Sequence, residues 1–133
     1  MAQILIVDDS GTARMFIKRC IEIAGLADAE FFEAGNGNEA LSILDKHSVT
    51  CVITDLNMPE CDGEMLLKQI KARPRLHDIP VVVITSAGNP AKELELMACG
   101  AVAVLSKPVS PAAIADAVGT LVNPKEDNHG WPT

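Results

Sequence analysis

Four short apolar segments of this sequence each run directly into residues whose side chains can take part in chemistry. These residues are Asp8 and Asp9, Asp55, Thr85 with Ser86, and Ser106 with Lys107. Three carboxylates held close together repel one another unless a cation lies among them. Mg²⁺ suits such oxygen ligands, because it takes one or two carboxylates, keeps several waters and binds phosphate oxygens. A carboxylate can also act as a nucleophile and form an aspartyl phosphate, so the pattern predicts Mg²⁺-dependent phosphoryl transfer to an acid.

Each of these residues also has an ordinary structural explanation when it is taken alone. An aspartate after a strand commonly caps a turn or the next helix. Lys107 precedes Pro108 and could be a solvated loop charge, and Thr85 could end its strand in a turn. These explanations together would require coincidences at four strand ends on one side of one sheet. We therefore prefer the interpretation of a functional site.

The elements that must position these residues alternate along the chain. Apolar, β-prone segments predict strands at 3–7, 29–33, 51–54, 80–84 and 101–105. A helix is predicted after each strand. The first runs from Gly11 to Gly25, with Ala13, Ile17, Cys20 and Ala24 on one face, and the last begins at Pro111, with Ile114, Val118 and Leu121 on one face. The other three are predicted around Ala40, Leu41 and Leu44, around Met65, Leu66 and Ile70, and from Pro90 to Gly100. Asn89 and Ser110 have the character of N-caps, each followed by a proline.

Five strand–helix repeats predict an α/β fold, in which a parallel sheet carries helices on both faces. Segment 80–84 is apolar throughout, as is typical of a strand covered on both faces. In such sheets the ligand site lies beyond the carboxyl ends of the strands. We therefore expect the acids, Thr85 and Lys107 to meet at one edge.

Composition excludes several other classes of function. The 133 residues include 18 acidic and 11 basic side chains, a formal net charge of −7, and aromatic residues make up only 3%. Nucleic-acid affinity depends largely on Lys and Arg, so we expect no nucleic-acid binding by this chain alone. No segment reaches the roughly 18–20 apolar residues that a membrane span requires. The N-terminus lacks the features of a signal peptide, so we expect a cytoplasmic protein without membrane contact.

Four motifs in register resemble the receiver domains of two-component response regulators, and CheY-like single-domain members look most similar. The motifs are Leu5-Ile6-Val7-Asp8-Asp9-Ser10, Asp55-Leu56-Asn57-Met58-Pro59-Glu60-Cys61-Asp62-Gly63, Val83-Ile84-Thr85-Ser86 and Leu105-Ser106-Lys107-Pro108. The resemblance covers about residues 3–122, so we expect a receiver domain at 1–122 and a mobile tail at 123–133. It implies a flavodoxin-like, doubly wound, five-stranded parallel sheet of order 2-1-3-4-5 with five helices.

The resemblance also implies how a metal would be held. Asp9 matches the direct Mg²⁺ ligand, and Asp8 matches its water-mediated or secondary partner. Asp55 matches a further ligand, and Asn57 matches the residue whose backbone carbonyl coordinates the ion. Magnesium is thus the expected cofactor.

The phosphoryl site follows from the same resemblance. Asp55 matches the phospho-acceptor, Thr85 the hydroxyl that moves to bond the phosphoryl group, and Lys107 the amine that bonds it from the other side. Pro108 matches a cis-proline. The chain is then not an enzyme but a signalling domain that assists its own phosphorylation and dephosphorylation.

The expected partners are a histidine kinase or phosphotransfer protein as donor, and an output protein that binds the face of the fourth helix, fifth strand and fifth helix. No output domain is expected after Val122. Two residues depart from the family pattern: Val104 stands where a large aromatic residue is frequent, and Ser86 where a small apolar residue is common. The first departure puts in doubt the relay from Thr85 to an aromatic side chain that is usual in the family. The second affects access to the phosphoryl group and therefore its lifetime.

Three other interpretations are compatible with parts of the pattern. A haloacid-dehalogenase-type enzyme also uses an aspartate nucleophile with Mg²⁺, but its second acid would stand where this chain has Asn57. A flavodoxin would have a Ser/Thr/Gly-rich phosphate loop in place of Asp8-Asp9, and this chain has no Tyr and only Trp131 for ring stacking. A receiver-like module that is never phosphorylated would be expected to lack Asp9, Asp55 or Lys107, and all three are present.

Overall fold

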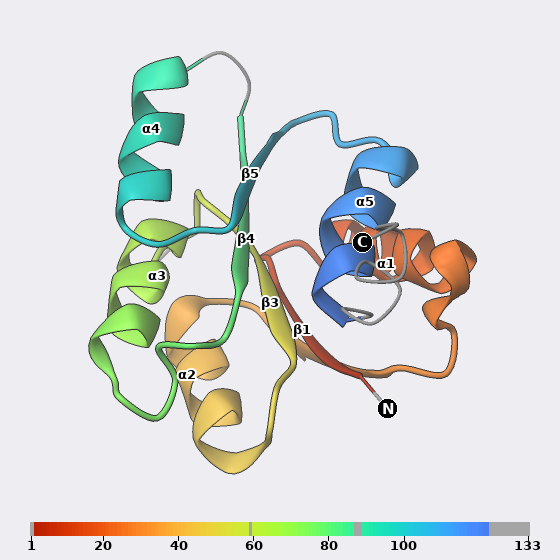
Figure 1. Cartoon of the computed structure of the whole chain (residues 1–133), viewed down its shortest axis with the longest axis horizontal. Helices are drawn as coiled ribbons and strands as arrows, with labels where there is room; N and C mark the ends of the chain where they lie inside the picture. Colours follow the sequence, from red (N-terminus) through yellow and green to blue (C-terminus); the bar gives the residue numbers. More distant parts are fainter. Residues whose placement is uncertain (1, 59, 87–88, 123–133) are drawn as a thin grey trace, which may run out of the picture.

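The computed structural model describes residues 2–58, 60–86 and 89–122. Within this part of the chain, five parallel strands form one sheet in the order β2-β1-β3-β4-β5 (Figure 1). The strands are β1 (Gln3–Val7), β2 (Glu30–Ala34), β3 (Cys51–Asp55), β4 (Val81–Thr85) and β5 (Ala103–Ser106). The predicted fold class and strand order are therefore confirmed.

Helices cover both faces of the sheet, as Figure 1 shows. They are α1 (Gly11–Ile21), α2 (Gly37–Lys46), α3 (Gly63–Ala72), α4 (Pro90–Ala98) and α5 (Pro111–Val122), and a π-helical turn, η1 (Glu22–Leu26), continues α1. The α1 and α5 helices pack together on one face, while α2, α3 and α4 cover the other. Among the described residues, no helix has the length and apolar character needed to cross a membrane.

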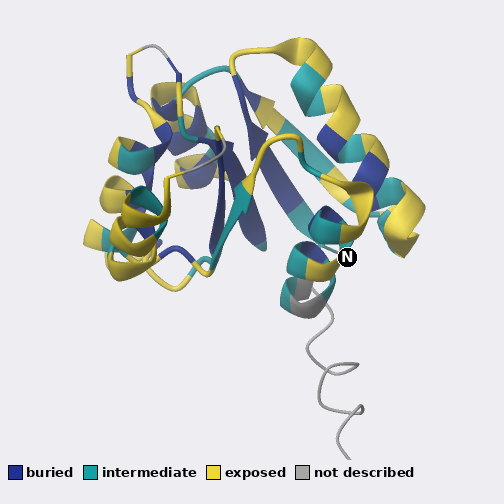
Figure 2. Ribbon diagram, turned by 90° about the horizontal axis from the view of Figure 1, so that it is seen from above, coloured by how far each residue is buried: buried dark blue, intermediate teal, exposed yellow. Residues whose placement is uncertain are grey.

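Side chains on β1 alternate between two hydrophobic cores, because successive residues of a strand point to opposite faces. Ile4 and Ile6 belong to the core under α1 and α5, whereas Leu5 and Val7 belong to the core under α2, α3 and α4. Every residue of β3 and β4 is buried, and Figure 2 shows these strands enclosed between the helical layers. The central strands therefore end in a well-packed environment that holds their last residues in place.

The predicted helix from Gly11 to Gly25 is only partly correct, because the α-helix ends at Ile21 and a wider π-helical turn follows. Gly25 has a φ of 111°, a left-handed conformation that glycine adopts without steric cost and that ends the helical path. Ile17 and Cys20 are buried as predicted. Ala24 is exposed, because the π-helical turn changes the register of the side chains.

Several strand boundaries differ from the predictions. The second and fourth strands begin and end one residue later than expected, and the third and fifth end one residue later. The fifth begins at Ala103, because the amide of Ala101 still donates to the Leu96 carbonyl at the end of α4. Met65 is half exposed, and the buried residues of α3 include Leu66, Leu67 and Ile70.

Short capped loops connect the carboxyl ends of the strands to the next helices. The predicted caps are confirmed: the Asn89 side chain accepts a hydrogen bond from the Lys92 amide at 3.0 Å, and Ser110 accepts one from the Ala113 amide at 3.0 Å. Ser10 caps α1 in the same way. Such caps satisfy amides that a helix start leaves unpaired, so the helices begin at defined positions near this edge of the sheet. The predicted tail at 123–133, with Trp131, lies outside the described residues.

Candidate functional site

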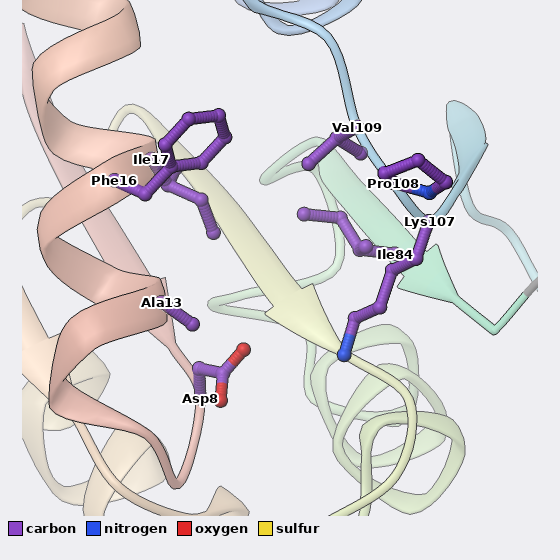
Figure 3. A pocket seen from close by; sticks show the side chains of 8 residues that line it. All are labelled: Asp8, Ala13, Phe16, Ile17, Ile84, Lys107, Pro108 and Val109. Atoms are coloured by element: carbon purple, nitrogen blue, oxygen red, sulfur yellow. The ribbon is translucent and has the colours of Figure 1, made fainter.

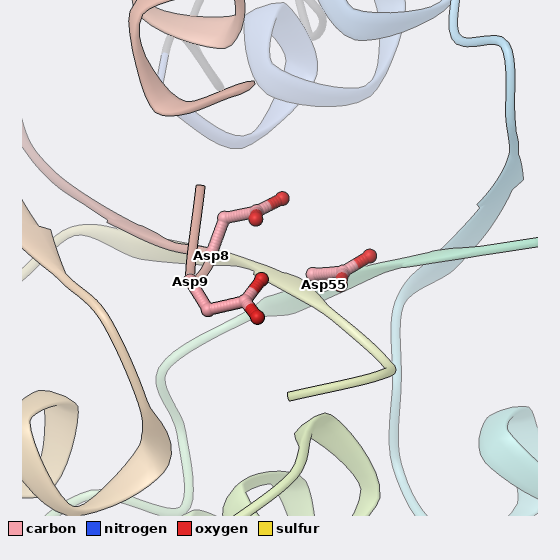
Figure 4. A group of neighbouring side chains, drawn as sticks. All are labelled: Asp8, Asp9 and Asp55. Carbon is pink, nitrogen blue, oxygen red and sulfur yellow. The ribbon is translucent and has the colours of Figure 1, made fainter. Parts of the chain in front are cut away.

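Three carboxylates meet at the carboxyl edge of the sheet, where β1 and β3 are neighbours. Asp8, Asp9 and Asp55 each place a carboxylate oxygen within 4.8 Å of the others (Figure 4). Asp8 and Asp55 are both only 4% exposed, whereas Asp9 is open to solvent. The arrangement offers oxygen donors of the kind that a hard cation such as Mg²⁺ prefers.

Asp8 is held by the start of the following helix. Its Oδ1 accepts a hydrogen bond from the Ser10 amide at 2.9 Å. Burial raises the pKa of Asp8, and the charge of Asp55 adds to this effect, while the Ser10 hydrogen bond and Lys107 act in the opposite direction. The close carboxylates therefore resist the accumulation of negative charge.

Lys107 supplies a positive charge beside the Asp55 carboxylate. Its Nζ lies 2.9 Å from Asp55 Oδ1, and the pairing raises the pKa of Lys107. The two groups are close enough for an ion pair, but Oδ1 is buried and has no partner of hydrogen-bonding geometry among the described residues. Asp55 Oδ1 thus retains acceptor capacity that a cation or a new covalent bond could use.

Thr85 ends β4, which lies beside β3. The register pairs Asp55 with Ile84, so Thr85 stands one residue further toward the site edge. Its hydroxyl is buried and donates to the Ser86 carbonyl at 2.9 Å. Lys107 is joined to the same strand, because its amide donates to the Thr85 carbonyl at 2.8 Å. Thr85 and Lys107 are therefore mechanically linked through adjacent strands.

The loop after β3 carries Asn57, which is exposed. The Leu56 amide donates to the Ile84 carbonyl at 2.8 Å, and the Gly63 amide donates to Leu56 at 2.9 Å. A Cβ atom on Gly63 would lie 2.2 Å from the Asp55 carbonyl oxygen. Only glycine fits this close approach, so Gly63 lets the loop fold back on the end of β3.

A family model of the response regulator receiver domain matches residues 4–119. This chain is a response regulator receiver domain. It is 37% identical over 113 residues to the chemotaxis protein CheY1 of Helicobacter pylori, a match that covers 84% of this chain and 90% of that protein.

Solved structures agree with this assignment. The chemotaxis response regulator CheY4 of Vibrio cholerae is similar with a TM-score of 0.80 and 30% identity, over 91% of this chain and 98% of that one. A signal receiver domain of a histidine kinase from Syntrophus aciditrophicus is similar with a TM-score of 0.82 and 32% identity, over 92% and 91% of the two chains. The chain is thus a CheY-like receiver domain of two-component signalling, and the dehalogenase and flavodoxin interpretations are set aside.

The structure brings most of the predicted site residues of this receiver domain together. Asp8, Asp9 and Asp55 form one cluster, and Lys107 contacts it directly. Thr85 lies at the adjacent strand end, and Asn57 lies in the loop after Asp55. The Lys107–Pro108 peptide bond is cis, as the resemblance implied.

An apolar groove opens beside this cluster in the receiver domain, between α1 and the segment after β5 (Figure 3). Its volume is about 570 Å³. Asp8 and Lys107 lie at one end, and Phe16, Ile17 and Val109 line its walls. The groove leaves the Lys107 side of the site accessible from solvent.

The roles of two residues near the site were not predicted from the sequence. Gly63 stands within the quoted motif 55–63, and its position after the capping residue Asp62 was an available signal. Arg14 donates to the backbone carbonyl of Asp8, a contact for which the sequence carries no signal, because any residue type offers the same carbonyl.

Proposed function

We propose that this receiver domain accepts a phosphoryl group on Asp55 in a Mg²⁺-dependent reaction and thereby changes a protein-binding surface. The observation that carries the proposal is the environment of Asp55. This carboxylate ends a fully buried central strand, lies within reach of Asp8 and Asp9, pairs with Lys107 and keeps Oδ1 free of hydrogen bonds from the described residues. A module that is never phosphorylated would have no need for such a costly cluster.

In the proposed reaction a carboxylate oxygen of Asp55 attacks the phosphorus atom of a phosphohistidine. A phosphorus–oxygen bond forms as the phosphorus–nitrogen bond breaks, and the electron pair of that bond stays on the imidazole nitrogen. Lys107 and the Thr85 hydroxyl stabilise the phosphoryl oxygens, because phosphoryl transfer requires mainly positioning and charge stabilisation. Mg²⁺, held by Asp9, Asp55 and the Asn57 carbonyl with Asp8 as outer partner, would neutralise further charge.

The donor would be a histidine kinase or a phosphotransfer protein, and the output partner would bind the face of α4, β5 and α5. The net charge of −7 supports the proposal that this partner is a protein and not a nucleic acid. We assign residues 1–122 to the domain, since the family match ends at residue 119 and α5 continues to Val122. A cytoplasmic location stays a prediction.

Incubation with acetyl phosphate and Mg²⁺ tests the acceptor. Wild type should gain one phosphoryl mass that is acid-stable and base-labile, and Asp55→Asn should not. Asp62→Asn is the matched control, because Asn can cap α3 through the same oxygen that accepts from the Met65 amide, and it should react like wild type. Uptake by Asp55→Asn at the wild-type rate would contradict the assignment, and no uptake by any form would favour a module that is not phosphorylated.

A further inference from the structure

Arg14 bridges three elements beside the acidic cluster. This residue lies on α1, and its Nη1 donates to the backbone carbonyl of Asp8 at 2.6 Å. Its Nε lies 2.8 Å from Oε1 of Glu33, which belongs to β2. One guanidinium group therefore ties the start of α1 and strand β2 to the backbone at the end of β1.

The carbonyl that Arg14 holds belongs to the peptide that joins the two adjacent acids. The amide of Asp8, on the other side of the same residue, donates to the Ala34 carbonyl at the end of β2 at 3.0 Å. A peptide group is planar, so the direction of the Asp8 carbonyl also sets the direction in which the chain continues to Asp9. The Asp9 side chain is exposed, so the position of its carboxylate depends on the orientation of this backbone.

The contacts of Arg14 favour a role in geometry over a role in charge. Asp55 and Lys107 are the nearby charges that shift the pKa of Asp8 most. The Arg14 charge is paired with Glu33 and meets the acidic segment at a neutral carbonyl. A planar guanidinium group can donate to a carbonyl and to a carboxylate at once, in fixed directions. A lysine ammonium on a flexible chain cannot reproduce this geometry.

We propose that Arg14, anchored by Glu33, is a positioning residue that holds the Asp8–Asp9 peptide in the orientation required for Mg²⁺ binding. The inference rests on the proposed Mg²⁺-dependent function. It adds a residue that touches neither metal nor phosphoryl group but determines how well the ligands are preorganised. Partners of this outer kind typically change metal affinity by about 10- to 100-fold when they are removed.

The test is the Mg²⁺ dissociation constant, measured from the amide shifts of Asp9 and Asp55 during a Mg²⁺ titration. Arg14→Gln should weaken binding by about 10-fold or more. Arg14→Lys should also weaken it, because the charge is kept while the two-point contact is lost, and Glu33→Gln should cause a smaller loss. Arg75→Gln is the matched control: it removes an Arg–carboxylate pair of the same 2.8 Å length, to Asp45, and should bind Mg²⁺ like wild type.

The sign of the effect separates positioning from charge. A purely electrostatic role predicts tighter Mg²⁺ binding by Arg14→Gln, because a nearby cation is removed. Tighter or unchanged binding in Arg14→Gln, or full affinity in Arg14→Lys, would overturn the inference alone. Failure of wild type itself to bind Mg²⁺ would overturn the proposed function and the inference with it. Should Arg14→Gln not fold, Arg14→Lys and Glu33→Gln decide the question.

Discussion

At the scale of single residues, the two buried carboxylates differ in how their charge is compensated. Asp55 has the ammonium group of Lys107 at 2.9 Å, whereas Asp8 relies on a backbone hydrogen bond from Ser10 and on the more distant charge of Lys107. Burial of a charged group costs free energy unless it is paired. The raised pKa of Asp8 reflects this cost.

Replacing Asp8 by asparagine should therefore stabilise the metal-free protein at neutral pH. The folded protein binds the Asp8 proton more strongly than the unfolded chain does. Stability consequently falls as pH rises from the ordinary pKa of 3.8 through the raised folded pKa, and the full penalty applies above it. Asparagine removes this penalty and keeps an oxygen for the Ser10 amide. Urea unfolding without Mg²⁺ should show a higher free energy of unfolding for Asp8→Asn at pH 7.

The stabilisation should shrink as pH is lowered toward 3.8, because Asp8 then becomes neutral in both states. The same variant should bind Mg²⁺ more weakly. Asp28→Asn, which changes an exposed carboxylate, controls for general changes of net charge. A loss of stability at pH 7, or a gain that does not depend on pH, would contradict the account of Asp8.

At the scale of elements, β4 and β5 connect the site to α4. Val104 lies on β5, pairs in register with Val83 and packs against the core under α2, α3 and α4. It is β-branched and stiff at χ1, so rotation of its side chain moves little surface. A signal from Thr85 to α4 through a swinging side chain at this position is therefore disfavoured. The backbone after Thr85 is the alternative route, although residues 87–88 lie outside the described part of the chain.

An ion pair joins α4 to α3 and limits how α4 can move. Lys92 on α4 lies 2.9 Å from Glu64 on α3 and 2.7 Å from Glu95 on its own helix. The pairing with Lys92, and then with Lys68, lowers the pKa of Glu64. Movement of α4 relative to α3 must stretch or exchange this ion pair, so a rearrangement of α4 should change the contact between Lys92 and Glu64.

Removing the Thr85 hydroxyl should reduce the response of α4 without preventing phosphoryl uptake. In the present structure this hydroxyl donates to Ser86, and it must leave that bond to reach a phosphoryl oxygen. A hydrogen bond to a charged acceptor contributes about 1.5–3 kcal/mol, so its loss should lower the ratio of switched to unswitched protein about 10-fold or more. Amide spectra with a beryllofluoride mimic of the phosphoryl group measure this ratio in wild type and Thr85→Ala.

Thr85→Ser keeps the hydroxyl and should respond like wild type. The amide signals of Ser86, Asn89 and the residues of α4 report this response. A full wild-type shift of α4 in Thr85→Ala would show that the signal takes another route.

At the scale of the whole molecule, the site lies where the two hydrophobic cores meet at the sheet edge. Three central strands, β1, β3 and β4, are covered on both faces, and the acids extend from the ends of β1 and β3. The unfolded chain does not hold these acids together. A cation that binds the cluster therefore stabilises the folded state selectively.

Mg²⁺ should accordingly raise the thermal stability of the entire domain. At a free concentration about 100 times the dissociation constant, the expected gain is about 2.7 kcal/mol. Calorimetry with increasing MgCl₂ measures it, with NaCl of matched ionic strength as the control. Asp9→Asn should lose most of the gain. A rise in Tm that NaCl reproduces, or that Asp9→Asn retains, would indicate general screening and not a site.

The sequence alone determined the fold class, the strand order through its family resemblance, and the set of residues at the strand ends. Apolar runs and helical periodicity are local patterns, and they locate elements because burial of one face imposes them. Acids placed directly after such runs must then converge, since parallel strands end at one edge. The sequence places Asp8, Asp9, Asp55, Thr85 and Lys107 at this edge in this way.

How these residues are held, and how far each is exposed, depends on contacts between elements that are distant in the sequence. Asp8 is buried and its neighbour Asp9 is open, although the two are adjacent and chemically identical. The π-helical turn after Ile21 rotated Ala24 out of the predicted face, because the periodicity of the sequence assumed an unbroken α-helix. Arg14 reaches a backbone carbonyl and a side chain on another strand. Such contacts depend on distances between elements, which the order of residues along the chain does not specify.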